Sequence, residues 1–195
     1  MPLWDTAAKS SPVPGAAPVP HLPPADFLRR RSGNDFRINP VIERKIVLGS
    51  TYLSLHYHLV WATKARRNLI DPRWDPKLHA FLGSFLKNLG GVAETINGTR
   101  DHLHILAGLR ATHSLADVVR DLKSLSAEWV HKELKVWDFG WQEGYFAATV
   151  SPTQRPSVRR YIAKQKEHHK TESSKTEMER LLKRAEIKYD PQYFE

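Results

Sequence analysis

Two histidines separated by a single residue, His102-Leu103-His104, form the sharpest chemical feature of the chain. Side chains alternate between the faces of a β-strand, so two residues at i and i+2 project from the same face. The apolar residues Leu103 and Ile105 have the opposite phase, which predicts that both imidazoles point away from the core. Two adjacent imidazoles on one face are suited to chelating one metal ion.

A second pair, His56-Tyr57-His58, has the same spacing in an earlier apolar segment and is also out of phase with its apolar neighbours. Spacing alone therefore does not decide between the two pairs. Either pair is also explained as polar side chains on the solvent face of a half-buried strand.

Tyr161 and Gln165 are four residues apart in a segment with a helical pattern, so we expect them to project from one face a single turn apart. A tyrosine among many basic side chains could present a phenol nucleophile to a phosphate. Alternatively, Tyr161 and Gln165 pack with Val158 and Ile162, and the basic face is only solvated. The basic residues of this segment are Arg155, Arg159, Arg160, Lys164, Lys166 and Lys170, against the single acid Glu167.

The elements that must position these residues follow the order β-α-β-β-α-β, with two further helices. This order predicts an α+β fold: a ferredoxin-like or RRM-like antiparallel sheet with helices on one face, plus C-terminal helices that carry the tyrosine. The opposite face of the sheet would be open for a site. We expect strands over 51–63, 92–96, 102–109 and 145–150, a turn at 97–98, and helices over about 75–89, 115–130, 156–169 and 175–185.

The composition narrows the possible functions. The 195 residues include no cysteine, which excludes disulfides, Cys-ligated metals and a thiol nucleophile. Lys and Arg number 30 against 21 acidic residues, and the net charge of +9 makes nucleic acid the first partner to test. There is no apolar run long enough to span a membrane and no apolar signal segment, so we expect a cytoplasmic protein without a membrane partner.

Proline divides the chain near residue 49. Eight of the 13 prolines precede residue 50, in a stretch rich in Pro and Ala. Such a stretch has little apolar surface to bury. We therefore predict a largely disordered leader over 1–48 and one domain over 49–195.

Taken together, these features resemble the HUH endonucleases, and more narrowly the single-tyrosine transposases of single-strand insertion sequences and the related REP-associated tyrosine transposases. The resemblance covers about residues 50–170, and the residues after His168 resemble the family's C-terminal helix. It is carried by the segments 57–64, 101–106, 144–150 and 161–165 and by Lys123, Ser124 and Ser126.

The resemblance implies a chemistry and a set of roles. Tyr161 would be the nucleophile, and His102, His104 and Gln165 would bind a divalent metal, Mg²⁺ or Mn²⁺. His58 would support the site. The implied reaction is cleavage and rejoining of single-stranded DNA through a 5′-phosphotyrosine, which makes the protein a DNA transposase.

The resemblance also implies partners. These are single-stranded DNA with a hairpin near the element ends and, by analogy with insertion-sequence members, a homodimer whose tyrosine helices act in trans; the REP-associated relatives can act as monomers. A prokaryotic, nucleoid-associated location would follow. Two alternatives remain: a domesticated, non-catalytic hairpin DNA- or RNA-binding protein, and a metal-dependent hydrolase unrelated to DNA. Candidate DNA contacts are Lys64, Arg66, Arg67, Arg110, Arg120, Lys123, Arg159, Arg160 and Lys164.

Overall fold

A computed structural model describes residues 51–190; the predicted leader over 1–48 lies outside the described residues. The predicted order of elements is confirmed, with a short 3-10 helix added after the first strand. The elements are β1 (His56–Ala62), η1 (Lys64–Arg66), α2 (Asp75–Asn88), β2 (Val92–Gly98), β3 (His102–Gly108), α3 (Leu115–Leu134), β4 (Phe146–Thr149), α4 (Arg155–Ala163), α5 (Gln165–His168) and α6 (Ser174–Arg184).

The four strands form one antiparallel sheet in the order β2-β3-β1-β4. This is the strand order of a ferredoxin-like sandwich, and the predicted α+β fold class is confirmed. β1 and β3 are the central strands, and Val60 of β1 pairs with His104 of β3. The predicted histidine pair therefore lies in the middle of the sheet rather than at an edge.

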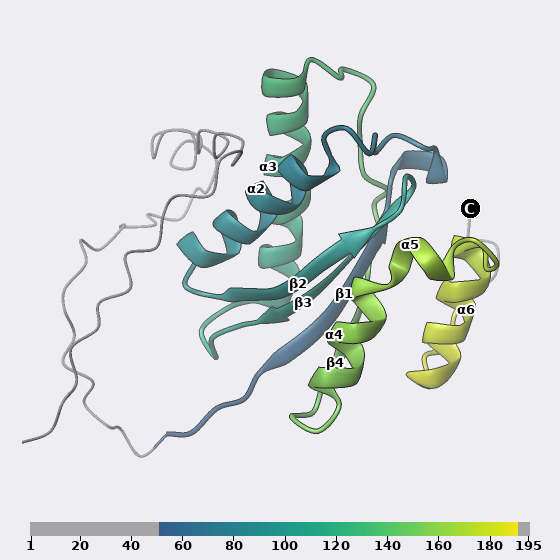
Figure 1. Ribbon diagram of the computed structural model, residues 1–195. Coiled ribbons are helices and arrows are strands. Elements are labelled where there is room, and N and C mark those ends of the chain that lie inside the picture. Colours follow the sequence, from purple (N-terminus) through teal and green to yellow (C-terminus); the bar gives the residue numbers. More distant parts are fainter. Residues whose placement is uncertain (1–50, 191–195) are drawn as a thin grey trace, which may run out of the picture.

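Helices α2 and α3 cover one face of the sheet and form the main core with it (Figure 1). The apolar phase of the central strands, including Leu59 and Ile105, faces these helices. In α2, Leu78, Leu82 and Leu86 recur at helical spacing and are fully buried. This face follows the hydrophobic pattern of the sequence.

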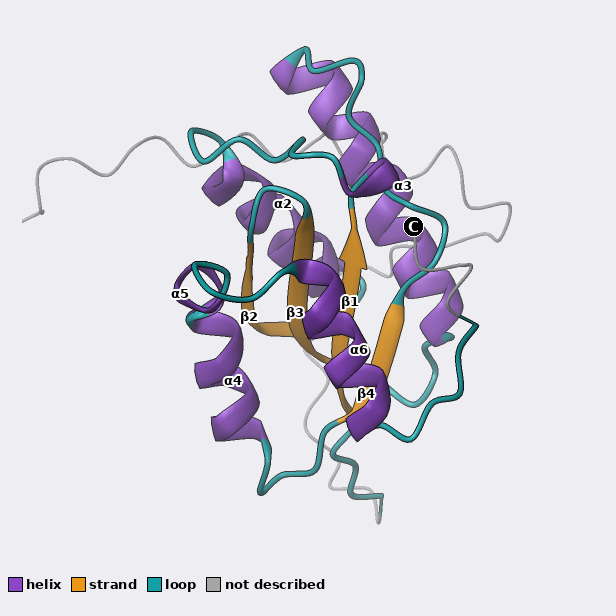
Figure 2. Cartoon of the chain, turned by 90° about the vertical axis from the view of Figure 1, so that its right-hand side faces the viewer, coloured by secondary structure: helices purple, strands orange, loops and turns teal. Residues whose placement is uncertain are grey.

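The opposite face of the sheet is covered by the C-terminal helices, with α4 and α6 in front of the strands in Figure 2. The expectation that this face stays open is therefore wrong. The physical reason is a second apolar set on the sheet, since Val60 and Leu106 point away from the main core. Val60 packs with Phe146 and with Met178, Leu181 and Leu182 of α6, whereas Leu106 packs with Val150 and with Ile162 of α4.

Two predicted strand limits are wrong. β1 begins at His56 rather than at residue 51, because the neighbouring strands pair only from His56 onward. Leu53, which lies inside the predicted strand, is 60% exposed. The predicted turn at 97–98 is still part of β2, and the chain reverses over the next three residues, where the Thr99 amide donates to the His102 carbonyl.

The predicted helix over 156–169 is broken at Lys164, which separates α4 from α5. In the described part of the chain, none of the helices is both long and apolar enough to cross a membrane.

Candidate active site

The side chains of His102 and His104 lie in a buried layer between the sheet and the C-terminal helices. Both project from β3 on the side away from the main core, as predicted, but they are 2% and 0% exposed because α6 covers them. Their Nε2 atoms are buried, and neither makes a hydrogen bond of good geometry. Two unsatisfied imidazole nitrogens side by side are what a metal ion would use.

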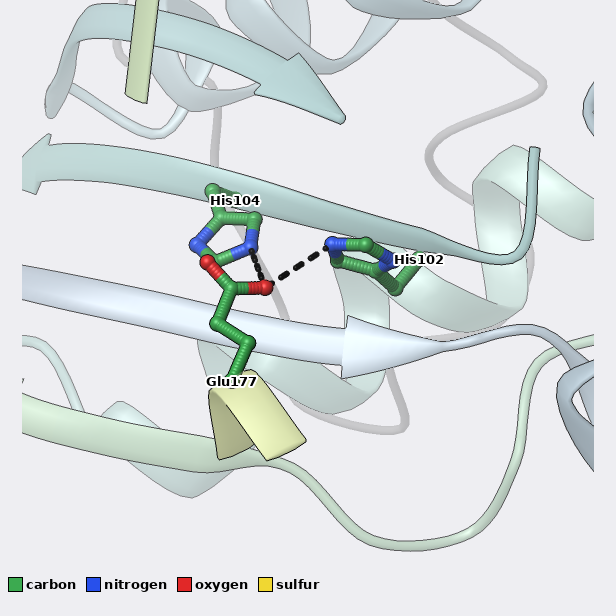
Figure 3. Close-up of side chains that lie close together, drawn as sticks. All are labelled: His102, His104 and Glu177. Atoms are coloured by element: carbon green, nitrogen blue, oxygen red, sulfur yellow. Dashed lines mark ion pairs between the residues drawn. The ribbon is translucent and has the colours of Figure 1, made fainter. Parts of the chain in front are cut away.

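The carboxylate of Glu177, on α6, lies at the point where these nitrogens converge (Figure 3). Its Oε2 atom is 3.2 Å from Nε2 of His102, 3.3 Å from Nε2 of His104 and 2.9 Å from Nε2 of His169. The residue is 2% exposed. Glu177 thus adds α6 to the site, which was predicted to contain His102, His104, Tyr161 and Gln165.

The other carboxylate oxygen of Glu177 contacts the two residues predicted on the basic helix. The hydroxyl of Tyr161 and Nε2 of Gln165 both donate to Oε1, the second at 2.8 Å. The Tyr161 and His104 rings lie 6.0 Å apart between centroids. The structure therefore brings all four predicted catalytic and metal-binding side chains together within one chain.

The break at Lys164 does not separate Tyr161 from Gln165. Gln165 begins α5 and is fully buried, with its Oε1 atom lacking a hydrogen-bond partner. This amide oxygen is a third buried polar atom without a hydrogen-bond partner, beside Nε2 of each of the two histidines. The helical spacing predicted the convergence correctly although the helix is not continuous.

Helix α4 is tied to the sheet at both of its ends. At its start, Arg155 pairs with Glu94 of β2, and the same carboxylate oxygen is 2.9 Å from Nε2 of His56. At its end, the Asn97 amide donates to the Ala163 carbonyl at 2.9 Å. These contacts fix the position of Tyr161 over its own sheet.

The structure also separates the rival histidines. His56 pairs with Glu94 near the opposite end of β1, so the His56–His58 pair does not converge on one point. His58 instead lies behind His104, with Nε2 at 2.9 Å from Nδ1 of His104 and the rings stacked 5.2 Å apart. His58 therefore orients His104, which fits the supporting position predicted for it.

His102 is oriented in a comparable way by Asp101. The Asp101 Oδ1 atom is 2.8 Å from Nδ1 of His102, and its Oδ2 atom accepts from the Ser174 hydroxyl at 2.7 Å. Gly98 makes this turn possible, because a Cβ at that position would overlap the His102 carbonyl. A carboxylate behind a histidine holds the ring and leaves Nε2 free for a metal.

The two histidines have opposite pKa shifts. Burial alone would lower the pKa of His102, but the carboxylates of Asp101 and Glu177 outweigh it and raise the pKa to about 9. Burial dominates at His104 and lowers its pKa to about 4 despite Glu177. Burial and the neighbouring His104 lower the pKa of His58 to about 3. Near pH 7, His102 is thus an imidazolium, whereas His104 and His58 are neutral.

The nucleophile candidate is held in its protonated form. Burial and the Glu177 carboxylate raise the pKa of Tyr161, and the nearby Arg180 opposes this in part. Burial would raise the pKa of Glu177, but the close imidazole nitrogens of His102, His104 and His169 keep it well below its usual range. A cation bound to Glu177 would weaken the effect of this carboxylate on the phenol.

The residues present fit a divalent metal. Ligand atoms of His102, His104 and Glu177 lie within 4.8 Å of one another. The unsatisfied Oε1 atom of Gln165 adds an amide oxygen nearby. Two imidazoles with a carboxylate and an amide form a mixed nitrogen and oxygen donor set that suits Mn²⁺ better than Mg²⁺.

The candidate DNA-contact residues do not form one patch. Arg110 lies beyond Gly108, the last residue of β3. Gly108 is about 20 Å along the strand from His102. The Arg67 guanidinium donates a hydrogen bond to the Asp138 carbonyl. Arg120 forms salt bridges with Asp117 and Asp121. Lys123 donates to the carbonyls of Glu143 and Gly144 and holds the loop before β4. Arg159 and Arg160 are exposed on α4, and Lys164 is exposed between α4 and α5. Lys64 is exposed in η1, and Arg66 is partly buried beside it.

Three residues near the site were not predicted: His169, Glu177 and Arg180. Glu177 precedes the apolar residue Leu181 by one helical turn, so it lies in the apolar stripe of α6. A carboxylate at a position that the pattern assigns to the buried face is the signal that could have identified it. No comparable pattern singles out His169 or Arg180.

Comparisons with known proteins show to which family the chain is similar. Residues 51–165 match the family model described as "Transposase IS200 like". The chain is 28% identical over 130 residues to the ISDra2 transposase TnpA of Deinococcus radiodurans, covering 64% of this chain and 92% of that protein. Among solved structures, a putative transposase from Deinococcus radiodurans is 27% identical with a TM-score of 0.48, covering 60% of this chain and 95% of that one. A REP-associated tyrosine transposase bound to a REP hairpin is 11% identical with a TM-score of 0.48, covering 62% and 72%.

Proposed function

Because the chain belongs to the IS200-like transposase family, we propose that it cleaves and rejoins single-stranded DNA through a 5′-phosphotyrosine. The observation that carries this proposal is the Tyr161 hydroxyl, which shares the Glu177 carboxylate with the buried His102 and His104. A phenol beside a metal-ligand set is suited to attack on a phosphodiester.

The Tyr161 oxygen bonds to phosphorus while the bond from phosphorus to the 3′ oxygen breaks. The phenol loses one proton to water and the departing 3′ oxygen takes up one. The 3′-hydroxyl of another strand end then attacks the phosphotyrosine and releases Tyr161. The energy of the phosphodiester is conserved, so neither step requires ATP.

We propose that His102, His104 and Gln165 bind a divalent metal, with Glu177 as a further ligand from α6. When bound, Mg²⁺ or Mn²⁺ would supply charge neutralisation at a non-bridging phosphate oxygen. Asp101 and His58 would hold the two imidazole rings from behind. Since His102 is protonated near pH 7, it must lose its proton when the metal binds.

The substrate we propose is single-stranded DNA with a hairpin near the cleavage site. Support comes from the related REP-associated transposase, which is described as bound to a REP hairpin. The excess of basic residues favours a nucleic-acid partner. The exposed residues Arg159 and Arg160 on α4, and Lys164 directly after it, are the best placed to meet the strand near Tyr161.

A single chain brings together the proposed nucleophile and the proposed metal ligands. Tyr161 lies over its own β3, so the geometry favours action in cis. The homodimer with tyrosine helices in trans remains a prediction. Mixing the variants Tyr161→Phe and His104→Ala tests it, because activity would recover only if the two chains exchange tyrosine helices.

The proposed function is tested by incubating the protein with a labelled, hairpin-bearing single strand and Mn²⁺, followed by denaturing electrophoresis. We expect a covalent protein–DNA adduct that is absent in Tyr161→Phe and in the presence of EDTA. Hairpin binding without any adduct would instead support the non-catalytic binding protein. An adduct that persists in Tyr161→Phe would overturn the assignment of the nucleophile.

A further inference from the structure

The Tyr161 hydroxyl oxygen has a second polar partner besides Glu177. Nη2 of Arg180, on α6, donates to it at 3.2 Å. The Arg180 guanidinium carbon also lies 5.6 Å from the centroid of the Tyr161 ring. A positive charge therefore touches the atom that we propose as the nucleophile.

Arg180 is held in this position by Glu172, in the segment before α6. Its Nε donates to Oε1 at 3.1 Å and its Nη2 to Oε2 at 2.8 Å. Two parallel contacts of this kind fix the plane of a guanidinium. The side chain is 30% exposed, so it lies at the margin of the site, where a strand could reach it. Its Nη1 has two further N–H donors for a phosphate oxygen.

The other cations around Tyr161 are arranged differently. Arg160, on α4, and Lys164, between α4 and α5, are both exposed. Within residues 51–190, Arg180 is the one cation found hydrogen-bonded to the Tyr161 hydroxyl. Glu177 and Arg180 are three residues apart on α6 and reach the same oxygen, one as acceptor and one as donor.

We propose that Arg180 is a catalytic residue of the strand-transfer reaction, which stabilises negative charge on the Tyr161 oxygen and on the scissile phosphate. The inference rests on the proposed function. As the Tyr161 oxygen bonds to phosphorus and the 3′ oxygen departs, charge spreads over the entering oxygen and the non-bridging oxygens. The guanidinium has one N–H on the entering oxygen and others free for the phosphate. It therefore stabilises the negative charge on both in the transition state and lowers the activation barrier.

A fixed donor aimed at developing charge typically contributes about 100-fold or more to a rate. We therefore expect Arg180→Gln to slow adduct formation about 100-fold at saturating DNA and Mn²⁺ in single-turnover measurements. Arg180→Lys should recover part of the rate, because an ammonium keeps the charge but loses the planar geometry. Glu172→Gln should give an intermediate rate, since it removes the charge that holds Arg180.

The control is Lys183→Gln, which removes an exposed charge from the same helix and should leave the rate unchanged. Melting temperature and Mn²⁺ affinity of Arg180→Gln should stay close to wild type, which separates lost catalysis from lost folding. Adduct formation at the wild-type rate or faster in Arg180→Gln would overturn this inference alone. An absence of adduct with the wild-type protein would contradict the proposed function as well.

Discussion

The Oε2 atom of Glu177 lies 3.2 Å from Nε2 of His102, across the interface between α6 and β3. The contact joins a residue near the end of the chain to the histidine that begins β3. It makes the C-terminal helix part of the candidate metal site, so α6 and the metal should stabilise one another.

Glu177→Gln should therefore weaken Mn²⁺ binding by about tenfold or more, because a neutral amide replaces an anionic ligand. Isothermal titration calorimetry with Mn²⁺ measures this directly. Glu179→Gln is the matched control, since Glu179 is on the same helix and is not among the candidate ligands. Unchanged Mn²⁺ affinity in Glu177→Gln would show that Glu177 does not bind the metal.

The contact between His58 and His104 leads to a second prediction. Since Nε2 of His58 lies 2.9 Å from Nδ1 of His104, it fixes the ring orientation that directs Nε2 of His104 to the metal. Removing such an outer partner typically costs about 10–100-fold in metal affinity. His58→Ala should lower Mn²⁺ affinity by this factor, as measured by the same titration.

His113→Ala serves as the comparison for His58→Ala. His113 hydrogen-bonds to the Leu89 carbonyl beyond the far end of β3 and touches none of the site residues. The Mn²⁺ affinity of His113→Ala should match that of the wild type. Equal losses in the two variants would mean that the effect of His58 is not specific to the site.

The sequence predicted the parts of the fold that depend on local pattern. The alternation of Leu103 and Ile105 with His102 and His104 assigned both histidines to the correct face of β3, and the i, i+4 spacing placed Tyr161 with Gln165. Both inferences depend only on the period of a strand or a helix. The element order was sufficient to predict the sheet topology.

The rest depends on contacts between distant segments. No local pattern indicates that α6 returns over β3. The sequence could mark Glu177 as a buried carboxylate, but it could not predict that His102 and Tyr161 are its partners. The break at Lys164 also has no local signal such as Pro or Gly. The sequence gives the number of basic residues but does not show which of them are free to contact DNA. The acid that pairs with Arg120 and the carbonyl that binds Lys123 are visible only in the structure.

The difference between exposed and salt-bridged basic residues leads to a third prediction. Arg160 is exposed on α4, whereas Arg120 is paired with Asp117 and Asp121. Arg160→Gln should weaken single-strand binding and reduce the salt dependence of log affinity by about one unit of slope. Arg120→Gln should change neither. Fluorescence anisotropy across a series of salt concentrations checks both, and an equal effect of the two variants would contradict this difference between the two residues.

The opposite pKa shifts of the histidines predict a stability maximum for the metal-free protein. The pKa of His104 is lowered to about 4 and that of His58 to about 3, so below pH 6.5 the unfolded chain binds more protons and acid destabilises the fold. The pKa of His102 is raised to about 9, so its contribution is complete below pH 6.5 and is lost as the pH rises towards 9.

Urea denaturation in EDTA should therefore give a free energy of unfolding that is highest near pH 6.5. We expect a loss on the order of 2 kcal/mol between pH 6.5 and 9 from the His102 shift. His102→Gln should remove most of the decline on the alkaline side while leaving that on the acid side. If the wild-type curve stayed flat from pH 6.5 to 9, His102 would not be protonated in the folded protein, and metal binding near pH 7 would no longer have to displace a proton from it.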